Sequence, residues 1–506
     1  MGVIAKQSIK GTIVTYLGVA VGFVTTFFVI TRFLTAEEIG LARVLIDAAV
    51  LFIGLAQLGT SSSIIRFYPY FVSNQQSAVS NQQPNEHGFF FWTLVVPMLG
   101  FLLVTAVFLA CYAPLCRWFG EKSPLFVNYY YLVLPLAFFM LYQTVFETNA
   151  NVRMRIVVPR IVRELLTRVG LLVVYLMYAF DFLSMDGFVW AMVGVYALAA
   201  LCNAVYLFSL GGISVKPDFA YLRQNPAIVR KYLFYTAFLV LSAVVSVLAP
   251  TLSSFFITAE MGLNYTGIFA IATYMAMMVS IPYRSLTAIA SPHLSIAIKQ
   301  GDNVETGRLL AQVSGNLLLI GGLILAAIWV NIDLIFAILP NGSTYAVARR
   351  TVLLLGVGQL IVATSQFAVT ALNYSRYYPF SLLFSFVLTV LALVLNNLFI
   401  PRWGMNGAAL AALVSQVSYF AIALVTVHIA LRSRLFMHRH LKTIVLLVLL
   451  FAANELCLHL LSEMNIWLSS MIRSVLVVAA AGLAYIWELS PEINNQIHAL
   501  LRRIRL

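Results

Sequence analysis

The chain has 506 residues, of which 62% are hydrophobic and only 10% are charged, and its mean hydropathy is +0.94. Soluble domains carry about 25% charged residues, so this composition excludes an ordinary water-soluble protein. Thirty-one Lys and Arg residues against 18 Asp and Glu give a net charge of +13. Such an excess suits nucleic acid, an acidic lipid surface or membrane topology, and the positions of the charges must decide.

Fourteen apolar runs follow one another along the chain, each long enough to cross a bilayer core about 30 Å thick as a helix. The predicted spans are 10–31, 41–64, 89–113, 127–149, 161–183, 187–209, 231–258, 265–287, 314–338, 351–373, 378–399, 405–431, 441–461 and 467–486. The predicted fold class is therefore an all-α polytopic membrane protein with about 14 transmembrane helices.

The distribution of Lys and Arg predicts that both termini face the cytoplasm. With the N-terminus inside, 22 basic residues fall on the cytoplasmic side and 7 on the outside. The positive surplus is then a topology signal, and no nucleic-acid partner is predicted.

Three short matches recur in the same order at offsets of 220 to 227 residues: 35–40 with 258–267, Pro159 with Pro379, and 186–191 with 406–411. Chance recurrence of Gly and Pro at loop corners explains any single match, whereas three in order favour a duplication. The sequence predicts an N-terminal lobe of helices 1–6 (1–213) and a C-terminal lobe of helices 7–12 (214–432). A C-terminal helix pair with a basic tail follows (433–506). Two six-helix repeats are related by an axis along the membrane normal, and a cleft is expected between them.

Span two carries the most informative polar stripe. Arg43 and Asp47 are one turn apart and share a helix face with Gln57 and Ser61. They form either a structural ion pair or a cavity wall that offers cations to an anionic ligand. Arg66 marks the inner end of the same span.

Polar residues recur in other spans, where they are costly unless they face a bundle interior or a wet cavity. Span four carries Glu147 in a stripe with Gln143 and Asn151, and span five begins with a stripe that contains Glu164 and Arg168. The two stripes either bond each other or line a cavity.

Three further residues complete the candidate site. Arg284 ends span eight, and Gln366 belongs to an amide stripe that acts as interhelical glue or binds sugar. Pro250 should kink span seven and is a candidate hinge.

Motifs for other chemistries are absent from the sequence. It has no glycine-rich phosphate loop, no His-Glu-x-x-His and no Gly-x-Ser-x-Gly, and its four cysteines show no paired spacing. His438 and His440 flank Arg439 in a basic connection that suits lipid headgroups or topology better than a metal. We predict no catalytic residue, no metal and no cofactor.

Two segments carry a family resemblance: Phe33-Leu34-Thr35-Ala36-Glu37-Glu38-Ile39-Gly40-Leu41-Ala42-Arg43-Val44-Leu45, and Ile65-Arg66-Phe67-Tyr68-Pro69-Tyr70-Phe71. With fourteen spans in two halves plus a terminal pair, the chain resembles the polysaccharide transporter (oligosaccharide flippase, O-antigen flippase type) branch of the multidrug/oligosaccharidyl-lipid/polysaccharide exporter superfamily. The resemblance implies a flippase, not an enzyme, in the bacterial inner membrane. It would move polyprenyl-pyrophosphate-linked oligosaccharide across that membrane for O-antigen, capsule or exopolysaccharide assembly.

The resemblance also suggests roles for the candidate residues. Arg66 and Arg284 would receive the pyrophosphate, and Arg43 and Arg168 would lie deeper in a cavity between the lobes. Asp47, Glu147 and Gln366 would line the same cavity, with the two carboxylates as candidates for a coupling proton or Na⁺. Rocking of the lobes about Pro250 would give alternating access.

The expected partners are the lipid-linked oligosaccharide, membrane lipids, a polysaccharide polymerase and glycosyltransferases. Two alternatives stay open. A cation-coupled multidrug antiporter of the same superfamily would show acidic cavity walls. A membrane glycan polymerase or ligase would need a sizeable outer loop, and none of the predicted outer connections is long enough.

Overall fold

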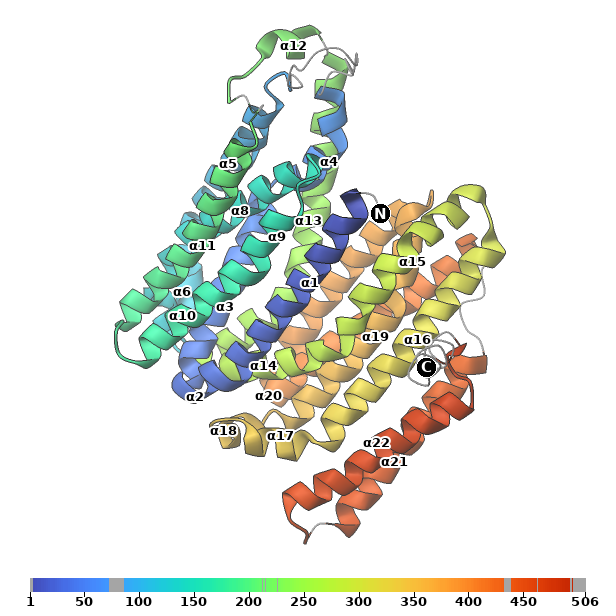
Figure 1. The fold of residues 1–506 in the computed structure, drawn as a ribbon. Helices are drawn as coiled ribbons and strands as arrows, with labels where there is room; N and C mark the ends of the chain where they lie inside the picture. Colours follow the sequence, from blue (N-terminus) through green and yellow to red (C-terminus); the bar gives the residue numbers. More distant parts are fainter. Residues whose placement is uncertain are drawn as a thin grey trace. The chain divides into compact units, whose positions relative to one another are not determined.

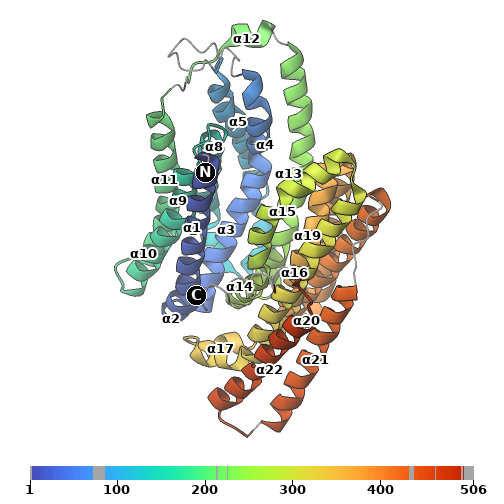
Figure 2. The ribbon, with the colours of Figure 1, turned by 45° about the vertical axis from the view of Figure 1, so that its right-hand side comes forward.

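The computed structural model describes residues 3–71, 86–211, 213, 215–224, 226–431, 438–461, 463–491 and 494. Every regular element among them is a helix, and the chain divides into two compact units, Met1–Gly267 and Ile268–Leu506. Figures 1 and 2 show the helices of each unit running side by side. A helix makes its backbone hydrogen bonds within one segment, which is what a chain needs in hydrocarbon, where no water is present to satisfy them.

The first unit holds the helices up to α13 and the first residues of α14, whose later residues, from Ile268, belong to the second unit. They are α1 (Val3–Val24), the π-helix η1 (Thr25–Ile30), α2 (Thr31–Phe33), α3 (Ala36–Ala56), α4 (Thr60–Phe71), α5 (Phe89–Ala110), α6 (Tyr112–Gly120), α7 (Pro124–Asn128), the 3₁₀-helix η2 (Tyr130–Leu132), α8 (Val133–Val152), α9 (Val157–Ile161), the π-helix η3 (Val162–Leu166), α10 (Thr167–Ala179), α11 (Met185–Ser209), α12 (Phe219–Gln224), α13 (Pro226–Glu260) and α14 (Leu263–Met277).

The second unit holds the remaining helices. They are the 3₁₀-helix η4 (Met278–Ser280), α15 (Ile281–Gln300), α16 (Asn303–Val330), α17 (Ile332–Ile338), α18 (Gly342–Ala346), α19 (Arg349–Tyr374), α20 (Tyr378–Leu431), α21 (His438–Leu460) and α22 (Ile466–Ile486). One apolar cluster of this unit joins α15, α16, α19 and α20 and includes Leu294, Leu317 and Phe367.

The predicted transmembrane architecture is confirmed. Eleven helical stretches in the described part of the chain are long and apolar enough to cross a bilayer. The stretch 379–431 holds two predicted spans, and the predicted spans 161–183 and 231–258 coincide with α9–α10 and α13. Each of the fourteen predicted ranges therefore coincides with helix over most of its length, and the chain is a multi-pass membrane protein.

Two turns interrupt long helical stretches, one between two predicted spans and one inside a predicted span. Within α20 the backbone at Gly404 adopts φ 56° and ψ −134°, a conformation that suits glycine, and it separates the two spans of that stretch. Span two is divided into α3 and α4 by a turn at 57–59, where Leu58 and Gly59 both have positive φ. The predicted polar face of span two is continuous only up to this turn.

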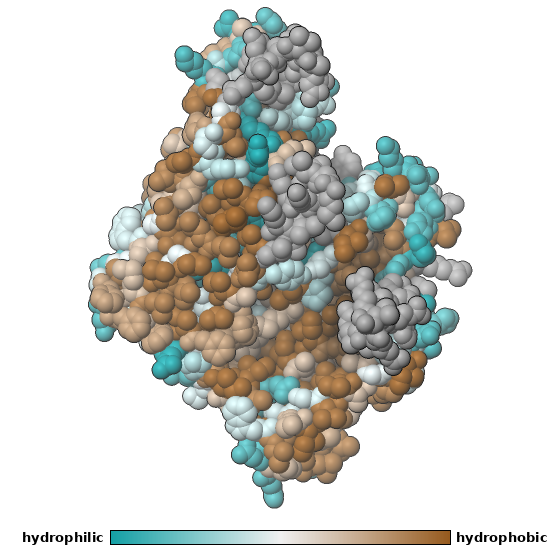
Figure 3. Space-filling view, viewed as in Figure 1, coloured by the Kyte–Doolittle hydropathy of each residue, from teal (hydrophilic) through white to brown (hydrophobic). Residues whose placement is uncertain are grey.

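The surface of the spans is apolar, as contact with lipid requires. Large side chains such as Leu103 on α5, Leu201 on α11 and Val478 on α22 are more than half exposed. The face drawn in Figure 3 is mostly apolar, with hydrophilic side chains gathered toward the ends of the helices. Several buried hydroxyls inside the spans donate to the carbonyl one turn earlier, as Thr31 does to Phe27 and Thr148 to Thr144, which satisfies them without water.

Candidate functional site

The predicted corner before span two is a helix N-terminus with a full capping box. Thr35 accepts a hydrogen bond from the Glu38 backbone through its side chain, and the Glu38 carboxylate accepts one from the Thr35 N–H. The hydroxyl of Tyr178 on α10 donates a hydrogen bond to the same carboxylate. This corner fixes the start of α3 and therefore the height of Arg43 and Asp47 along the helix.

Arg43 and Asp47 form an ion pair along α3. The Arg43 Nε lies 2.8 Å from an Asp47 carboxylate oxygen, and the Asp47 side chain is buried. The i,i+4 spacing that the sequence displays is therefore used for a contact within the helix. Arg43 is about one-quarter exposed, so the pair sits at the edge of the packed interior.

Glu147 and Arg168 belong to one ionic chain that joins three helices of the first unit. Arg163 of η3 lies 2.9 Å from the Glu147 carboxylate on α8 and 3.5 Å from that of Glu164. Glu164 lies 3.0 Å from Arg168, and Arg168 also donates to the Gly18 carbonyl of α1 at 2.6 Å. Arg163, which belongs to neither predicted stripe, therefore links Glu147 of span four to Glu164 of span five. Whether these residues also line a cavity stays a prediction.

Sequence reasoning missed two parts of this ionic chain. Arg163 was counted only as a topology charge, although it bridges both carboxylates. The close approach of α1 had a signal in Gly18 and Gly22, which are four residues apart on one face. The Glu164 backbone packs against Gly18, and the Arg168 side chain packs against Gly22. The π-helix η3, in which Glu164 lies, had no sequence signal.

Arg66 stands apart from these paired cations. It is exposed on α4, and its guanidinium lies 4.2 Å from the centre of the Tyr235 ring on α13. No carboxylate among the described residues lies within 4 Å of it. The aromatic face holds the cation in place through a cation–π contact while its N–H groups stay available to a ligand.

The remaining candidates lie in the second unit or on α13. Arg284 is exposed in the first turn of α15 and has no carboxylate partner among the described residues. Gln366 is partly buried on α19, and its backbone carbonyl accepts a hydrogen bond from the Thr370 hydroxyl. Position 250 lies in the helical part of α13, and its role as a hinge stays a prediction.

The sequence analysis did not predict one further ion pair of the first unit. Arg153 at the end of α8 binds both oxygens of Glu86 through its Nη2, at 2.6 and 2.5 Å. Tyr68 of α4 donates to the same carboxylate. Both charges are almost fully buried, so the pair ties α4 and α8 to the residues that precede α5. Their separation of 67 residues gives no sequence signal.

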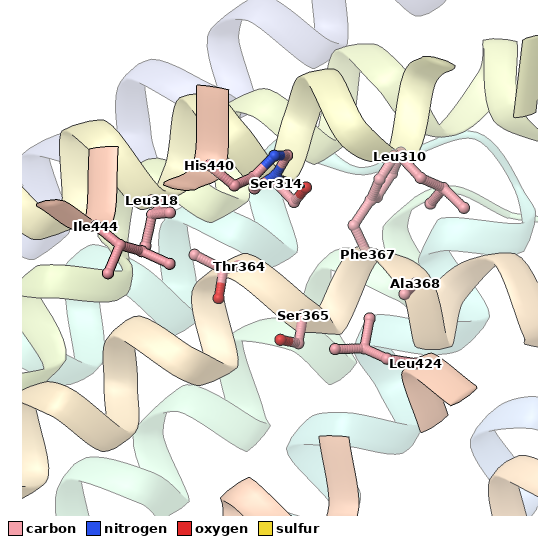
Figure 4. Close-up of a pocket in the computed structure, with 10 residues that line it drawn as sticks. All are labelled: Leu310, Ser314, Leu318, Thr364, Ser365, Phe367, Ala368, Leu424, His440 and Ile444. Atoms are coloured by element: carbon pink, nitrogen blue, oxygen red, sulfur yellow. Dashed lines mark hydrogen bonds between the residues drawn. The ribbon is translucent and has the colours of Figure 1, made fainter. Parts of the chain in front are cut away.

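The second unit contains a cavity of about 160 Å³ (Figure 4). Its walls come from α16, α19, α20 and α21 and are mainly apolar, with Leu310, Phe367 and Leu424 among the lining residues. His440 and Ser314 form a polar pair at its edge, with 2.9 Å between the imidazole Nε2 and the hydroxyl. None of the seven predicted site residues lines this cavity.

Comparison with protein families gives one match. The family described as "Polysaccharide biosynthesis protein" matches residues 4–296. No curated protein matches the chain.

Several solved structures share the fold. "Lipid II flippase MurJ, inward closed conformation" has a TM-score of 0.66 at 10% identity and covers 94% of this chain and 99% of its own. An inward-facing multidrug resistance MATE family transporter of the MOP superfamily has a TM-score of 0.60 at 15% identity, covering 85% and 96%. The Vibrio cholerae MATE transporter VcmN has a TM-score of 0.57 at 14% identity, covering 85% and 98%. At these identities the likeness establishes the fold.

Proposed function

The chain belongs to the polysaccharide biosynthesis protein family, and from this premise we propose that it flips a polyprenyl-pyrophosphate-linked oligosaccharide across the bacterial inner membrane. The family and the fold are those of membrane transporters rather than enzymes. A hydrated sugar and a pyrophosphate do not cross about 30 Å of hydrocarbon unaided, whereas the polyprenyl tail is stable there. A flippase must therefore offer the headgroup cations and hydrogen-bond donors within the membrane.

Arg66 carries the proposal. It is an exposed cation whose guanidinium is held by Tyr235 and has no carboxylate partner among the described residues. A planar guanidinium presents several donors to phosphate oxygens and keeps its charge at all relevant pH values. Arg284 offers the same chemistry on α15. We assign the first contact with pyrophosphate to these two residues.

Arg43 and Arg168 differ from Arg66 and Arg284, because each is already paired with a carboxylate one helical turn away. In the proposal they bind phosphate only by exchanging that partner. The exchange at Arg43 would release Asp47, and the exchange at Arg168 would release Glu164. Asp47 and Glu147, which pairs with Arg163 in the same ionic chain, are the proposed candidates for a coupling proton or Na⁺. Alternating access by rocking of the two predicted lobes, with bending of α13 at Pro250, completes the mechanism.

The test is the delivery of lipid-linked glycan to the outer leaflet in cells that depend on this protein. Arg66→Gln removes the charge and is expected to lower delivery about ten-fold, the loss that one or two charge-assisted hydrogen bonds predict. Arg66→Lys keeps the charge without the planar donors and should fall between. Arg117→Gln, which removes another exposed cation of the first unit, is the matched control. Normal delivery by Arg66→Gln at equal protein level would refute the assignment.

A multidrug antiporter is the second candidate, because Asp47 and Glu147 are buried carboxylates in a fold that MATE transporters share. This function predicts proton- or Na⁺-driven efflux of cationic drugs that Asp47→Asn or Glu147→Gln abolishes. Drug efflux by proteoliposomes without any effect of the protein on lipid-linked glycan would favour it over the flippase.

A further inference from the structure

The short helix α12 lies in the connection between α11 and α13, at one end of the first unit. Figures 1 and 2 both show it beyond the ends of α5 and α13. The sequence predicts this connection on the cytoplasmic side, where the leaflet is rich in anionic lipids. Because α12 lies in the connection between two predicted spans, we expect it at the level of the lipid headgroups.

Contacts on its inner face hold α12 in place. The Asp218 carboxylate accepts a hydrogen bond from the Tyr221 backbone N–H at 3.0 Å and lies 3.2 Å from the His87 Nδ1. The Tyr221 ring stacks on His87 with 4.3 Å between centroids, and its hydroxyl donates to the Tyr70 carbonyl. The Tyr221 N–H, together with His87, holds the pKa of Asp218 below its ordinary value, so this carboxylate is charged at neutral pH.

The opposite face is both apolar and cationic. Val215 and Phe219 are 48% and 56% exposed, and Phe219 touches Trp92 only through a ring edge. Arg223 follows Phe219 by one helical turn, so the two side chains share the outer face. Arg230 and Lys231 extend the exposed positive charge onto the start of α13. We call these five residues the α12 surface: Val215, Phe219, Arg223, Arg230 and Lys231.

We propose that the α12 surface binds the anionic phospholipid headgroups of the leaflet beside it. Exposed aliphatic and aromatic side chains next to cations are the combination that inserts at the boundary of acyl chains and headgroups. The cations have no carboxylate partner among the described residues, and the one acidic side chain of the segment, Asp218, is engaged with His87. A soluble polyanion would match the charges but would leave Val215 and Phe219 in water.

Lipid binding here reaches the transport helices because the same connection leads directly into α13. Tyr235, which holds Arg66, lies nine residues after Pro226, the first residue of α13. When the α12 surface binds anionic lipid, it fixes the position of the start of α13. The negative charge of the leaflet can therefore influence α13, the helix whose Tyr235 contacts Arg66. The inference does not depend on the identity of the transported substrate.

The test uses the full-length protein with its four cysteines replaced by serine and with Ala220→Cys, an exposed position of α12. The protein is placed in nanodiscs of phosphatidylcholine alone or with one-third phosphatidylglycerol. The rate of reaction with a water-soluble maleimide is then measured. We expect labelling to be at least about five-fold slower in the anionic discs, because bound lipid shields position 220 from the maleimide. Each Lys or Arg near an anionic surface strengthens binding by about this factor.

Variants separate the α12 surface from general effects of charge. Arg223→Gln, Arg230→Gln and Lys231→Gln together should make the labelling rates in the two kinds of disc equal. Arg350→Gln with Arg402→Gln, which neutralises exposed cations of the second unit, should leave the five-fold difference intact. Equal rates for the unmodified α12 surface in both discs would overturn the proposal. So would a difference that the triple variant retains, or one that soluble polyphosphate reproduces in neutral discs.

Discussion

Gly40 of α3 and Gly267 of α14 lie against each other at a helix crossing that is the same from both sides. A Cβ on Gly40 would lie 1.9 Å from the Leu263 carbonyl oxygen, and a Cβ on Gly267 would lie 1.9 Å from that of Ala36. The partners are related by one offset, from 36 to 263 and from 40 to 267. Such reciprocity is what a duplication predicts for two equivalent corners, and the repeat itself stays a prediction.

Because backbone occupies the space of both missing side chains, substitution at either glycine should destabilise the protein. Gly40→Ala and Gly267→Ala are each expected to cost about 1–3 kcal/mol, as for overpacking elsewhere. Thermal unfolding in detergent measures the loss. Gly194→Ala in α11 is the matched control, because nothing lies within 4 Å of the added methyl. Equal melting temperatures for Gly40→Ala and Gly194→Ala would mean that the two helices can separate freely.

Loss of the carboxylate from the buried Glu86 and Arg153 pair should destabilise the protein more than the same loss from an exposed ion pair. Glu86→Gln leaves the Arg153 charge buried without its carboxylate and is expected to cost about 3–5 kcal/mol. The exposed pair Glu305 and Arg308 provides the control, since Glu305→Gln should cost no more than about 1 kcal/mol. Thermal unfolding of both variants gives the comparison. A similar shift in both would show that water reaches Arg153.

Much of the fold could be predicted because hydropathy and charge act along the sequence. Fourteen apolar runs gave fourteen helical ranges, and the capping box at Thr35 and Glu38 follows from residue types three positions apart. The turn at Leu58 could not be predicted, because a leucine with φ 46° is held there by its surroundings rather than by its own preference. Its only local signal is Gly59.

The candidate site was predictable only where partners share a helix. The Arg43 and Asp47 contact follows from their spacing, and the sequence named it as one of two interpretations. Arg163 with Glu147, Arg66 with Tyr235 and Arg153 with Glu86 depend on which helices become neighbours. Pattern within one span contains no such information. The division into lobes at 213 and 432, the hinge and the orientation of the termini stay predictions.

A double-mutant cycle on Arg43 and Asp47 separates their structural contribution from transport. Asp47→Asn alone should destabilise the protein more than the double variant Arg43→Gln/Asp47→Asn, because the single change leaves an uncompensated cation. Melting temperatures of the four proteins give the coupling. Glycan delivery, measured for the same four proteins, shows whether the pair also contributes to transport. If the double variant is as stable as the parent and still active, the pair has no part in the flippase mechanism.

Arg473 of α22 makes the sharpest claim about a buried charge. It is 1% exposed, and its hydrogen bonds to other described residues are two long ones of 3.4 Å, to Ser469 and Ser470 within its own helix. Its Nη1 has no hydrogen-bond partner among the described residues. A buried cation with so little compensation lowers stability relative to an apolar side chain of similar volume.

Arg473→Met should therefore leave the melting temperature unchanged or raise it. Arg473→Ala should lower it, because truncation adds a cavity at a tightly packed position. A Met variant that unfolds as easily as the Ala variant would show that the guanidinium makes a strong contact in the membrane. Arg473 would then join the functional cations, and its effect on glycan delivery should be compared with that of Arg66→Gln.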